Sequence, residues 1–455
     1  MRFTALKTVL MASASLLVAC ESTSESQANE RTEVYTPAPT RTPTTTTRPP
    51  TTPEPQATPT PTSSSLSQII GPFRSSGHAA LDAWRDDFAQ RAYGQGFHVT
   101  TIRSVLSGIE PMSIFLESRA DIVHQSEFSK PIWEYLDSAV SSSRISNGRE
   151  KLATDASLFA DLERTYGVPG EYLTAIWGME TSYGQVKGDF DAPSALSSMA
   201  TEGRRRAFAE GELLALMRIL DRGDAKREWL QAGWAGAMGH TQFMPSTYYA
   251  YAVDWTGDGT IDVWNARADA LASAANYLSK SGWRAGEPAV REVTLPPAFD
   301  YSLADGEERT IPIWGTLGLE PVGYTELAPG TVNKAELWLP AGKDGPAFLL
   351  FTNFRMIKTY NRADSYALAV SLLAENIAGR ASPSAAWPRD IDRLSIEEVK
   401  VLQNQLNQLG YNAGVVDGIA GRGTRKALQN FQADRRMMAD GYPTQRALNA
   451  VLNGR

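Results

Sequence analysis

Residues 175–184 read AIWGMETSYG, a stretch in which apolar residues surround a single glutamate. The YGVP sequence at residues 166–169 precedes it and supplies a turn with a proline that suits the first position of a helix. We therefore expect a helix to begin near Pro169. Four residues of this helix fall at helical spacing on one face, namely Leu173, Ile176, Trp177 and Glu180.

Glu180 stands on the face of this helix that otherwise points into the core. Burial disfavours the charged form of a carboxyl group, so a glutamic acid in this position can keep its proton near neutral pH and donate it. The alternative is a buried glutamate that pairs with an arginine for structural reasons. The helix taken alone supports both interpretations about equally.

The composition is typical of a globular protein. With 455 residues, 42% hydrophobic and 21% charged, the chain can bury a sizeable core and has the length of two or three domains. Its net charge of −7 argues against binding to nucleic acid. The single cysteine, Cys20, excludes an internal disulfide bond and a thiolate metal site. The four histidines lack the spacing of zinc ligands, which disfavours zinc amidase chemistry.

Residues 1–20 have the organisation of a lipoprotein signal peptide. A basic start is followed by an apolar run too short to span a bilayer comfortably, and LVAC at residues 17–20 resembles a bacterial lipobox. We expect Cys20 to be lipidated and to tether the protein to a membrane. Because no Asp follows Cys20, the resemblance favours the outer membrane, on the periplasmic side of the bacterial envelope. The alternative is an ordinary cleaved signal peptide with an incidental cysteine.

Two linkers divide the rest of the chain. Residues 21–66 consist mostly of Thr, Pro and Ser, so we expect a disordered and extended tether. Residues 381–390 are a second linker, rich in Ser, Ala and Pro. A large domain is therefore expected over residues 67–380 and a small one over residues 391–455.

The large domain is expected to be mainly α, with a small β-containing insertion that makes the fold class α+β. Apolar residues recur at helical spacing from Leu81 to Leu278 and again from Tyr366 to Ile377. Between these regions they occur in short runs bounded by Pro, Gly and Asp, which predicts strands. The residues assigned to strands are Val293, Leu295, Ile311, Ile313, Leu337, Leu339 and the run 348–351.

The small domain is expected to be a module of three short helices. Ser395 and Glu398 form a capping box, and Gly410 ends the helix that begins there. Two further helix starts resemble each other, TRKAL at residues 424–428 and TQRAL at residues 444–448.

A glycine-rich loop reads AGAMGHTQFMP at residues 235–245. Small residues let a backbone approach a ligand closely, and the amide of Gln242 offers both a donor and an acceptor to a polar substrate. A glycine-rich loop followed by a helix cap at Ser246 explains the same residues without a ligand, and in isolation that is the better interpretation.

A second loop, DWTGDGTID at residues 254–262, resembles the first half of an EF-hand Ca²⁺ loop. Oxygen side chains occupy alternate positions and glycine stands at the sixth. The twelfth position is Asn265 instead of glutamate, so Asp269 is the candidate that completes the shell. An Asx-rich turn that needs no ion is the alternative.

Together these motifs resemble the B-type membrane-bound lytic murein transglycosylases. The resemblance lies in YGVP, AIWGMETSYG, the AGAMGxxQFMP loop and AVDxxGDG, with further matches at Asn353-Phe354, Tyr360-Asn361 and Tyr366-Ala367. These motifs occur in the family's order and cover most of residues 75–380. It implies a lysozyme-like, mainly helical catalytic domain that cleaves the MurNAc–GlcNAc bond of peptidoglycan. The tail, with DG at residues 417–418 and FQ at residues 431–432, is similar to the small helical peptidoglycan-binding domain.

The resemblance also implies roles for individual residues. Glu180 matches the catalytic acid and base, and His240 occupies a variable position without a catalytic role. Substrate contacts are implied at Arg204, Arg205, Gln242, Tyr360 and Tyr366. Ca²⁺ ligands, as in some members of the family, are implied at Asp254, Thr256, Asp258, Thr260 through its carbonyl, and Asp269. Many members carry Ser where this chain has Gly233, so the resemblance implies that one hydroxyl contact with the substrate is missing here. No cofactor is required for the reaction.

A single carboxyl group can cleave a glycosidic bond when the nucleophile belongs to the substrate. The resemblance implies that Glu180 protonates the bridging oxygen and then takes the proton of the MurNAc C6 hydroxyl, which attacks C1 and leaves 1,6-anhydro-MurNAc. A hydrolytic muramidase stays open, although it needs a second carboxylate that the motifs do not supply. A non-enzymatic peptidoglycan-binding lipoprotein also stays open. Expected partners are glycan strands, a membrane through the anchor, and cell-wall synthesis or division proteins, but no nucleic acid.

Overall fold

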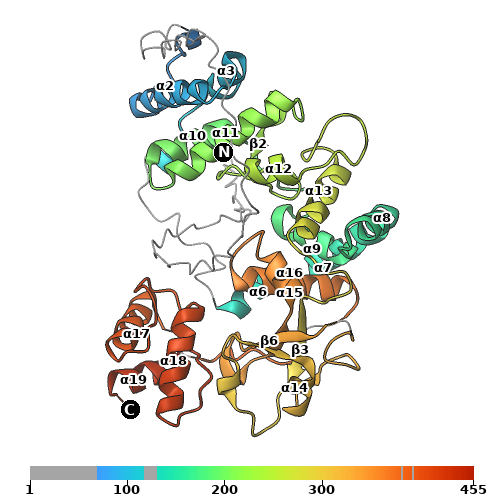
Figure 1. The fold of residues 1–455 in the computed structure, drawn as a ribbon, viewed down its shortest axis with the longest axis vertical. Helices are drawn as coiled ribbons and strands as arrows, with labels where there is room; N and C mark the ends of the chain where they lie inside the picture. Colours follow the sequence, from blue (N-terminus) through green and yellow to red (C-terminus); the bar gives the residue numbers. More distant parts are fainter. Residues whose placement is uncertain (1–68, 117–130, 331, 381–382, 392–393, 455) are drawn as a thin grey trace, which may run out of the picture.

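The computed structural model describes residues 69–116, 131–330, 332–380, 383–391 and 394–454. Figure 1 shows a mainly helical large domain with a small sheet, followed by three C-terminal helices, as predicted. The expected signal peptide with Cys20 and the whole of the first linker lie outside the described residues. Within the described part of the chain, no helix combines the length and the apolar character needed to cross a bilayer.

Helices make up most of the large domain. In chain order they are α2 (Ala79–Gly94), α3 (Val99–Leu106), α4 (Ser113–Leu116), α6 (Ile132–Ala139), α7 (Ser142–Thr154), α8 (Ala156–Tyr166), α9 (Gly170–Thr181), α10 (Ala192–Glu202), α11 (Arg206–Arg222), α12 (Pro245–Tyr251), α13 (Arg267–Lys280), α14 (Ile311–Thr316), α15 (Thr352–Ile357) and α16 (Asp364–Ile377).

Helix α9 begins where the sequence predicts, with Pro169 as the residue before its first turn. Gly167 adopts φ of 73° and ends α8, so the chain reverses between the two helices. An added Cβ on Gly170 would lie 2.8 Å from Phe159, which shows how closely the start of α9 crosses α8. Almost all of α9 is buried, and it packs against α16, α7 and α13.

Two small sheets complete the large domain. Strands β1 (Phe190–Asp191) and β2 (Gln231–Ala232) form an antiparallel pair. The second sheet is antiparallel and has the order β4-β6-β7-β3-β5. Its strands are β3 (Val290–Thr294), β4 (Glu308–Thr310), β5 (Glu320–Pro321), β6 (Lys334–Trp338) and β7 (Ala347–Leu350).

Strand β7 joins two hydrophobic cores. Successive side chains of a strand point to opposite faces. Accordingly, Phe348 and Leu350 belong to the main core beneath α15 and α16, whereas Leu349 belongs to a second core around Trp314. The sheet is therefore buried on both sides at β7, which explains the continuous apolar run in the sequence.

The assignment of Ile311 and Ile313 to strands is wrong. Both residues lie in the short helix α14, which has Pro312 in its first turn. Ile313 is 47% exposed, while Trp314 is fully buried and its indole N–H donates to the carbonyl of Ala335 at 2.9 Å. Two apolar residues at i and i+2 imitate strand alternation, and burial of the neighbouring tryptophan selects the helix instead.

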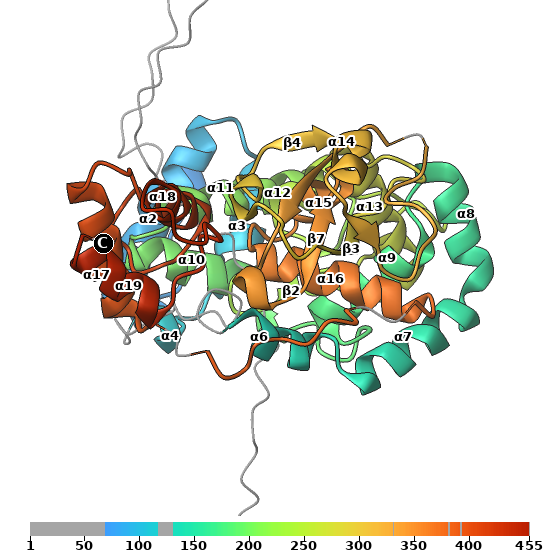
Figure 2. The ribbon, with the colours of Figure 1, turned by 90° about the horizontal axis from the view of Figure 1, so that it is seen from below.

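The C-terminal module has the three predicted helices, α17 (Ile396–Gln408), α18 (Arg422–Asp434) and α19 (Gln445–Leu452). The capping box of Ser395 and Glu398 is present in both directions. A core of Leu, Ala, Phe and Val side chains fills the space between the helices. Figures 1 and 2 place this module beside the large domain, with α18 the helix next to it.

Candidate active site

Glu180 lies in the last turn of α9, and the residues that follow it reverse the chain sharply. Ser182 and Tyr183 have positive φ values of 50° and 63°, an unfavourable conformation for residues with a side chain. The reversal stacks the Tyr183 ring on Gly178, where an added Cβ would lie 2.6 Å from the ring. The Tyr183 hydroxyl donates to the carbonyl of Arg144 at 2.6 Å. This turn holds the end of the helix that carries Glu180.

Glu180 is only 3% exposed, and the hydroxyl of Tyr366 donates a hydrogen bond of 2.5 Å to its Oε1 atom. Tyr366 comes from α16, 186 residues further along the chain. A hydrogen bond to an ionised carboxylate is stronger than one between neutral groups, and exclusion of water strengthens it further. The structure therefore makes Tyr366 a direct partner of the candidate acid.

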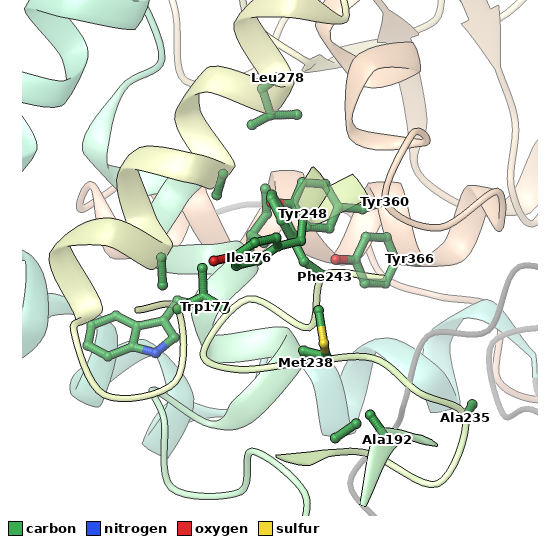
Figure 3. Packing of buried hydrophobic residues seen from close by; sticks show 14 of the residues in the cluster. Ile176, Trp177, Ala192, Ala235, Met238, Phe243, Tyr248, Leu278, Tyr360 and Tyr366 are labelled. Atoms are coloured by element: carbon green, nitrogen blue, oxygen red, sulfur yellow. The ribbon is translucent and has the colours of Figure 1, made fainter. Parts of the chain in front are cut away.

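Tyr360 and Tyr366 remain protonated in this environment. Burial raises the pKa of both hydroxyls well above the usual value, and the charge of Glu180 adds to the shift. Among the described residues, the buried Tyr360 hydroxyl has no hydrogen-bond partner. Figure 3 shows Tyr360, Tyr366 and Phe243 in one cluster. A buried hydroxyl without a partner is rare and calls for an explanation.

Gln242 lies in a tight turn of the glycine-rich loop. Met238 and Phe243 pair across the turn as an antiparallel bridge, and Gln242 adopts a positive φ of 51°. Its side-chain N–H₂ group donates to the carbonyls of Lys187 at 3.1 Å and Gly239 at 3.0 Å. The side-chain nitrogen of Gln242 is thus engaged by the protein itself. The side-chain oxygen is the group that can accept a hydrogen bond from a ligand.

The glycines of this loop approach the protein's own chain. A Cβ added to Gly239 would lie 2.3 Å from the carbonyl oxygen of Val263. A Cβ added to Gly236 would lie 2.7 Å from the Leu196 side chain. Both glycines have positive φ values. We expected these glycines to let the backbone approach a ligand. At these two positions, the small size instead allows the loop to pack against the protein's own chain.

Arg204 and Arg205 lie between α10 and α11. Arg204 is exposed, and its side chain pairs with Glu202. Arg205 is partly buried, and its guanidinium lies 4.4 Å from the centre of the Phe208 ring. Burial lowers its pKa, while Glu212 opposes that shift. Both side chains keep a positive charge near neutral pH, since arginine does not lose its proton in proteins.

The loop of residues 254–262 is folded around its aspartates. Asp254 accepts backbone N–H groups from Gly257 at 2.7 Å and Gly259 at 2.9 Å, and Gly259, the sixth residue, has φ of 88°. Asp269 is fully buried and accepts N–H groups from Trp255, Thr256 and Asp262, each at 3.0 Å. In the described chain, no three acidic, histidine or cysteine side chains meet as a ready metal cage. The positive φ and the oxygen donors suit the Ca²⁺ loop that the sequence suggests.

His240 supports α9 from outside. Its Nδ1 accepts the indole N–H of Trp177 at 3.1 Å, and its carbonyl accepts the hydroxyl of Thr181 at 2.7 Å. Burial and the positive charge of Lys187 lower the pKa of His240 to about 4, so the ring is neutral near pH 7. Neither contact could be found from the sequence, because His240 and α9 are some 60 residues apart.

Glu212 is a second buried glutamate, and the sequence did not reveal its partner, Ser246. Glu212 accepts the backbone N–H and the hydroxyl of Ser246, both at 2.8 Å, and joins α11 to the first turn of α12. Burial raises its pKa. A buried glutamate with a purely structural partner therefore exists in this fold, and it differs from Glu180 in having Ser246 instead of a tyrosine.

Comparison with known proteins agrees with this geometry. Residues 80–375 match the family described as Transglycosylase SLT domain, and residues 395–451 match a peptidoglycan binding domain family. The chain is 34% identical to Membrane-bound lytic murein transglycosylase B of Escherichia coli over 224 residues, 47% of this chain and 58% of that protein. The matched region thus spans little more than half of that relative.

Solved structures resemble more of the chain. SltB3 of Pseudomonas aeruginosa, in complex with NAG-anhNAM-pentapeptide, is 41% identical with a TM-score of 0.76, and the match covers 82% of this chain and all of that one. The E. coli transglycosylase Slt35, in complex with calcium, is 26% identical with a TM-score of 0.54 over 68% of this chain and 96% of that one. The chain therefore belongs to the transglycosylase SLT domain family of lytic murein transglycosylases, and it carries a C-terminal domain of the peptidoglycan-binding family.

Proposed function

We propose that this protein is a lytic transglycosylase that cleaves the MurNAc–GlcNAc bond of peptidoglycan, with Glu180 as its acid and base. The observation that carries the proposal is the buried hydrogen bond between Tyr366 and Glu180, in a chain that belongs to the transglycosylase family. The related SltB3 was solved with both NAG-NAM-pentapeptide and NAG-anhNAM-pentapeptide. That pair of ligands supports an anhydro product for this chain as well.

Glu180 first acts as the acid. Tyr366 donates to Oε1, so the proton of the neutral carboxyl group is held on Oε2 and is transferred from there to the bridging oxygen. As the bond breaks, charge develops on the carboxylate, and the buried Tyr366 hydroxyl stabilises it without any rearrangement. Glu180 then takes the proton of the MurNAc C6 hydroxyl, which attacks C1 and closes the 1,6-anhydro ring.

The remaining site residues bind the substrate in this proposal. The partnerless hydroxyl of Tyr360 and the amide oxygen of Gln242 offer a donor and an acceptor to sugar hydroxyl or N-acetyl groups. Arg204 and Arg205 bring positive charge for the carboxylates of MurNAc and its peptide. Tyr366 has a different part from the one that the resemblance implies, because its hydroxyl is already engaged with Glu180.

Mass spectrometry of the fragments released from purified sacculi tests the proposal. The full chain should release products that end in 1,6-anhydro-MurNAc, and Glu180→Gln should release none while still binding sacculi. Glu171→Gln is the matched control, since it removes a charge from the first turn of the same helix, where Glu171 pairs with Arg380 at 3.3 Å. Ends with reducing MurNAc would show that water is the nucleophile, as in a muramidase. Binding without any cleavage by the folded protein would favour a structural lipoprotein.

Two further features belong to the proposal. We place a Ca²⁺ ion in the 254–262 loop, held by Asp254, Thr256, Asp258, the carbonyl of Thr260, and Asp269; the calcium complex of the related Slt35 supports this choice. The ion would stiffen the loop and takes no part in proton transfer.

The second feature is the place of the protein in the cell. We propose that a lipid on Cys20 holds it at the outer membrane, facing the periplasm, where cell-wall synthesis or division proteins are its expected partners. The similarity to a membrane-bound transglycosylase supports an envelope location. Cys20→Ser should move the protein from the membrane fraction to the soluble fraction without loss of cleavage. Retention of the variant at the membrane would contradict the anchor.

A further inference from the structure

The C-terminal module is attached to the large domain by side-chain contacts as well as by its linker. Gln429 on α18 donates to the carbonyls of Tyr301 at 3.1 Å and Ala304 at 3.0 Å. Arg425 donates to the carbonyls of Leu339 at 3.2 Å and Pro340 at 3.0 Å. These bonds dock one face of α18 against the sheet region (Figure 1).

Arg422, the first residue of α18, extends this contact to two carboxylates of the large domain. Its guanidinium donates to both oxygens of Glu336, at 2.8 Å and 3.1 Å, and to Oδ2 of Asp364 at 3.1 Å. Glu336 is a buried residue of β6, and Asp364 is the first residue of α16. One side chain of the module thus joins the sheet to the helix that carries Tyr366.

Asp364 lies in the same segment as Tyr360 and Tyr366. Its Oδ1 atom accepts a hydrogen bond from the ammonium group of Lys358 at 2.6 Å, which links the two ends of the segment 358–364 that contains Tyr360. Two residues after Asp364, Tyr366 leaves the first turn of α16 to meet Glu180. The segment 358–366 is therefore held at Asp364 by one cation from the large domain and one from the module.

The charges explain why Arg422 is needed there. Burial raises the pKa of Glu336 and the charge of Asp364 raises it further, whereas Arg422 acts in the opposite direction. Burial also tends to raise the pKa of Asp364, but Arg422 and Lys358 bring it below its usual value. Without Arg422 the two carboxylates would repel each other, and of the two Asp364 is the one on the segment that carries the tyrosines.

We propose that Arg422 is a positioning residue, through which the docked C-terminal module holds the segment 358–366 so that Tyr366 meets Glu180. The module then contributes to the chemical step besides binding the wall. This inference rests on the proposed function of Glu180 and Tyr366. It predicts that a substrate too short to reach the module still requires the Arg422 contact.

Steady-state kinetics on a soluble fragment of two GlcNAc–MurNAc disaccharides tests this inference, with the full chain as the enzyme. Arg422→Met should lower kcat about tenfold, since displacements of about 1 Å in an active site can cost up to about a hundredfold, and KM should change less than twofold. Asp364→Asn removes the other end of the contact and should lower kcat similarly. The double variant should lose less than the product of the two single losses, because the Arg422–Asp364 contact is common to both changes.

Two controls separate positioning from general effects. Arg435→Met removes a charge from the end of the same helix, where Arg435 contacts only its own module, and should leave kcat unchanged. Arg422→Lys keeps the charge and should recover part of the lost kcat. If Arg422→Met does not fold, Asp364→Asn decides, with a lower kcat at an unchanged KM as the expected result.

Three results would overturn the inference: a kcat of Arg422→Met within twofold of the wild type, an effect confined to KM, or losses that multiply in the double variant. Absence of anhydro products from the wild-type protein would instead refute the proposed function, and this inference with it.

Discussion

Replacement of Tyr366 by phenylalanine tests the active site most directly. The change removes one oxygen atom, which lies 2.5 Å from Oε1 of Glu180, and keeps the ring in its fully buried position. Because the hydroxyl remains protonated, it acts as the donor whenever Glu180 is a carboxylate. Tyr366→Phe therefore removes stabilisation from the carboxylate that forms when Glu180 gives up its proton.

The size of the effect follows from this contact. A hydrogen bond to a charged group contributes about 1.5–3 kcal/mol. If that stabilisation is lost in the transition state, kcat should fall by a factor of about 10 to 150. Substrate binding should change little, because the Tyr366 hydroxyl contacts the acid instead of the sugar.

The assay is the rate of 1,6-anhydro product release from sacculi at saturating substrate. Tyr172→Phe is the matched control, since Tyr172 is a buried tyrosine of α9 whose hydroxyl accepts the N–H of Ala289 at 3.1 Å and does not contact Glu180. It should lose stability but not rate. A Tyr366→Phe variant that is folded and cleaves within threefold of the wild type would refute the assigned role of the hydroxyl.

Three further predictions concern stability. Gly178→Ala should destabilise the protein by about 1–3 kcal/mol, measured as a lower Tm, because the new methyl group meets the Tyr183 ring. Gly211→Ala is the control: Gly211 lies in α11 with open space around it, and the change should stabilise the protein by about 0.5–1 kcal/mol. The pKa of His240 is depressed to about 4 from about 6.5, so its contribution of about 3 kcal/mol is complete above pH 6.5 and is lost as pH falls towards 4. Urea unfolding at pH 7.5 and 4.5 should show this loss, and His240→Gln should reduce it. Ca²⁺ at about 100 times its Kd should stabilise the wild type by about 2.7 kcal/mol. A chelator, or the Asp254→Asn substitution, should abolish that gain. Equal Tm values with and without Ca²⁺ would exclude a bound ion.

Local sequence patterns determined most of the secondary structure. The start of α9 after Pro169, the capping box of Ser395 and Glu398, and the buried strand β7 all depend on residues within a few positions of each other. The error at Ile311 and Ile313 has the same origin, since a two-residue alternation is too short to separate a strand from a helix when Trp314 supplies the burial. Family motifs in the sequence also placed the candidate acid and the loop of Gln242.

Only the tertiary structure decided how these residues work together. The contact between Glu180 and Tyr366 joins positions 186 residues apart, and the contact of Arg422 with Asp364 joins two domains across 58 residues. The sequence by itself determined that a glutamate stands on a buried helix face and that tyrosines follow far downstream. Hydrogen bonds between distant side chains depend on how helices pack, and packing is a property of the whole core rather than of any local pattern. For that reason the partner of the acid, the structural role of the glycines at 236 and 239, and the docking of the C-terminal module became visible only in the folded chain.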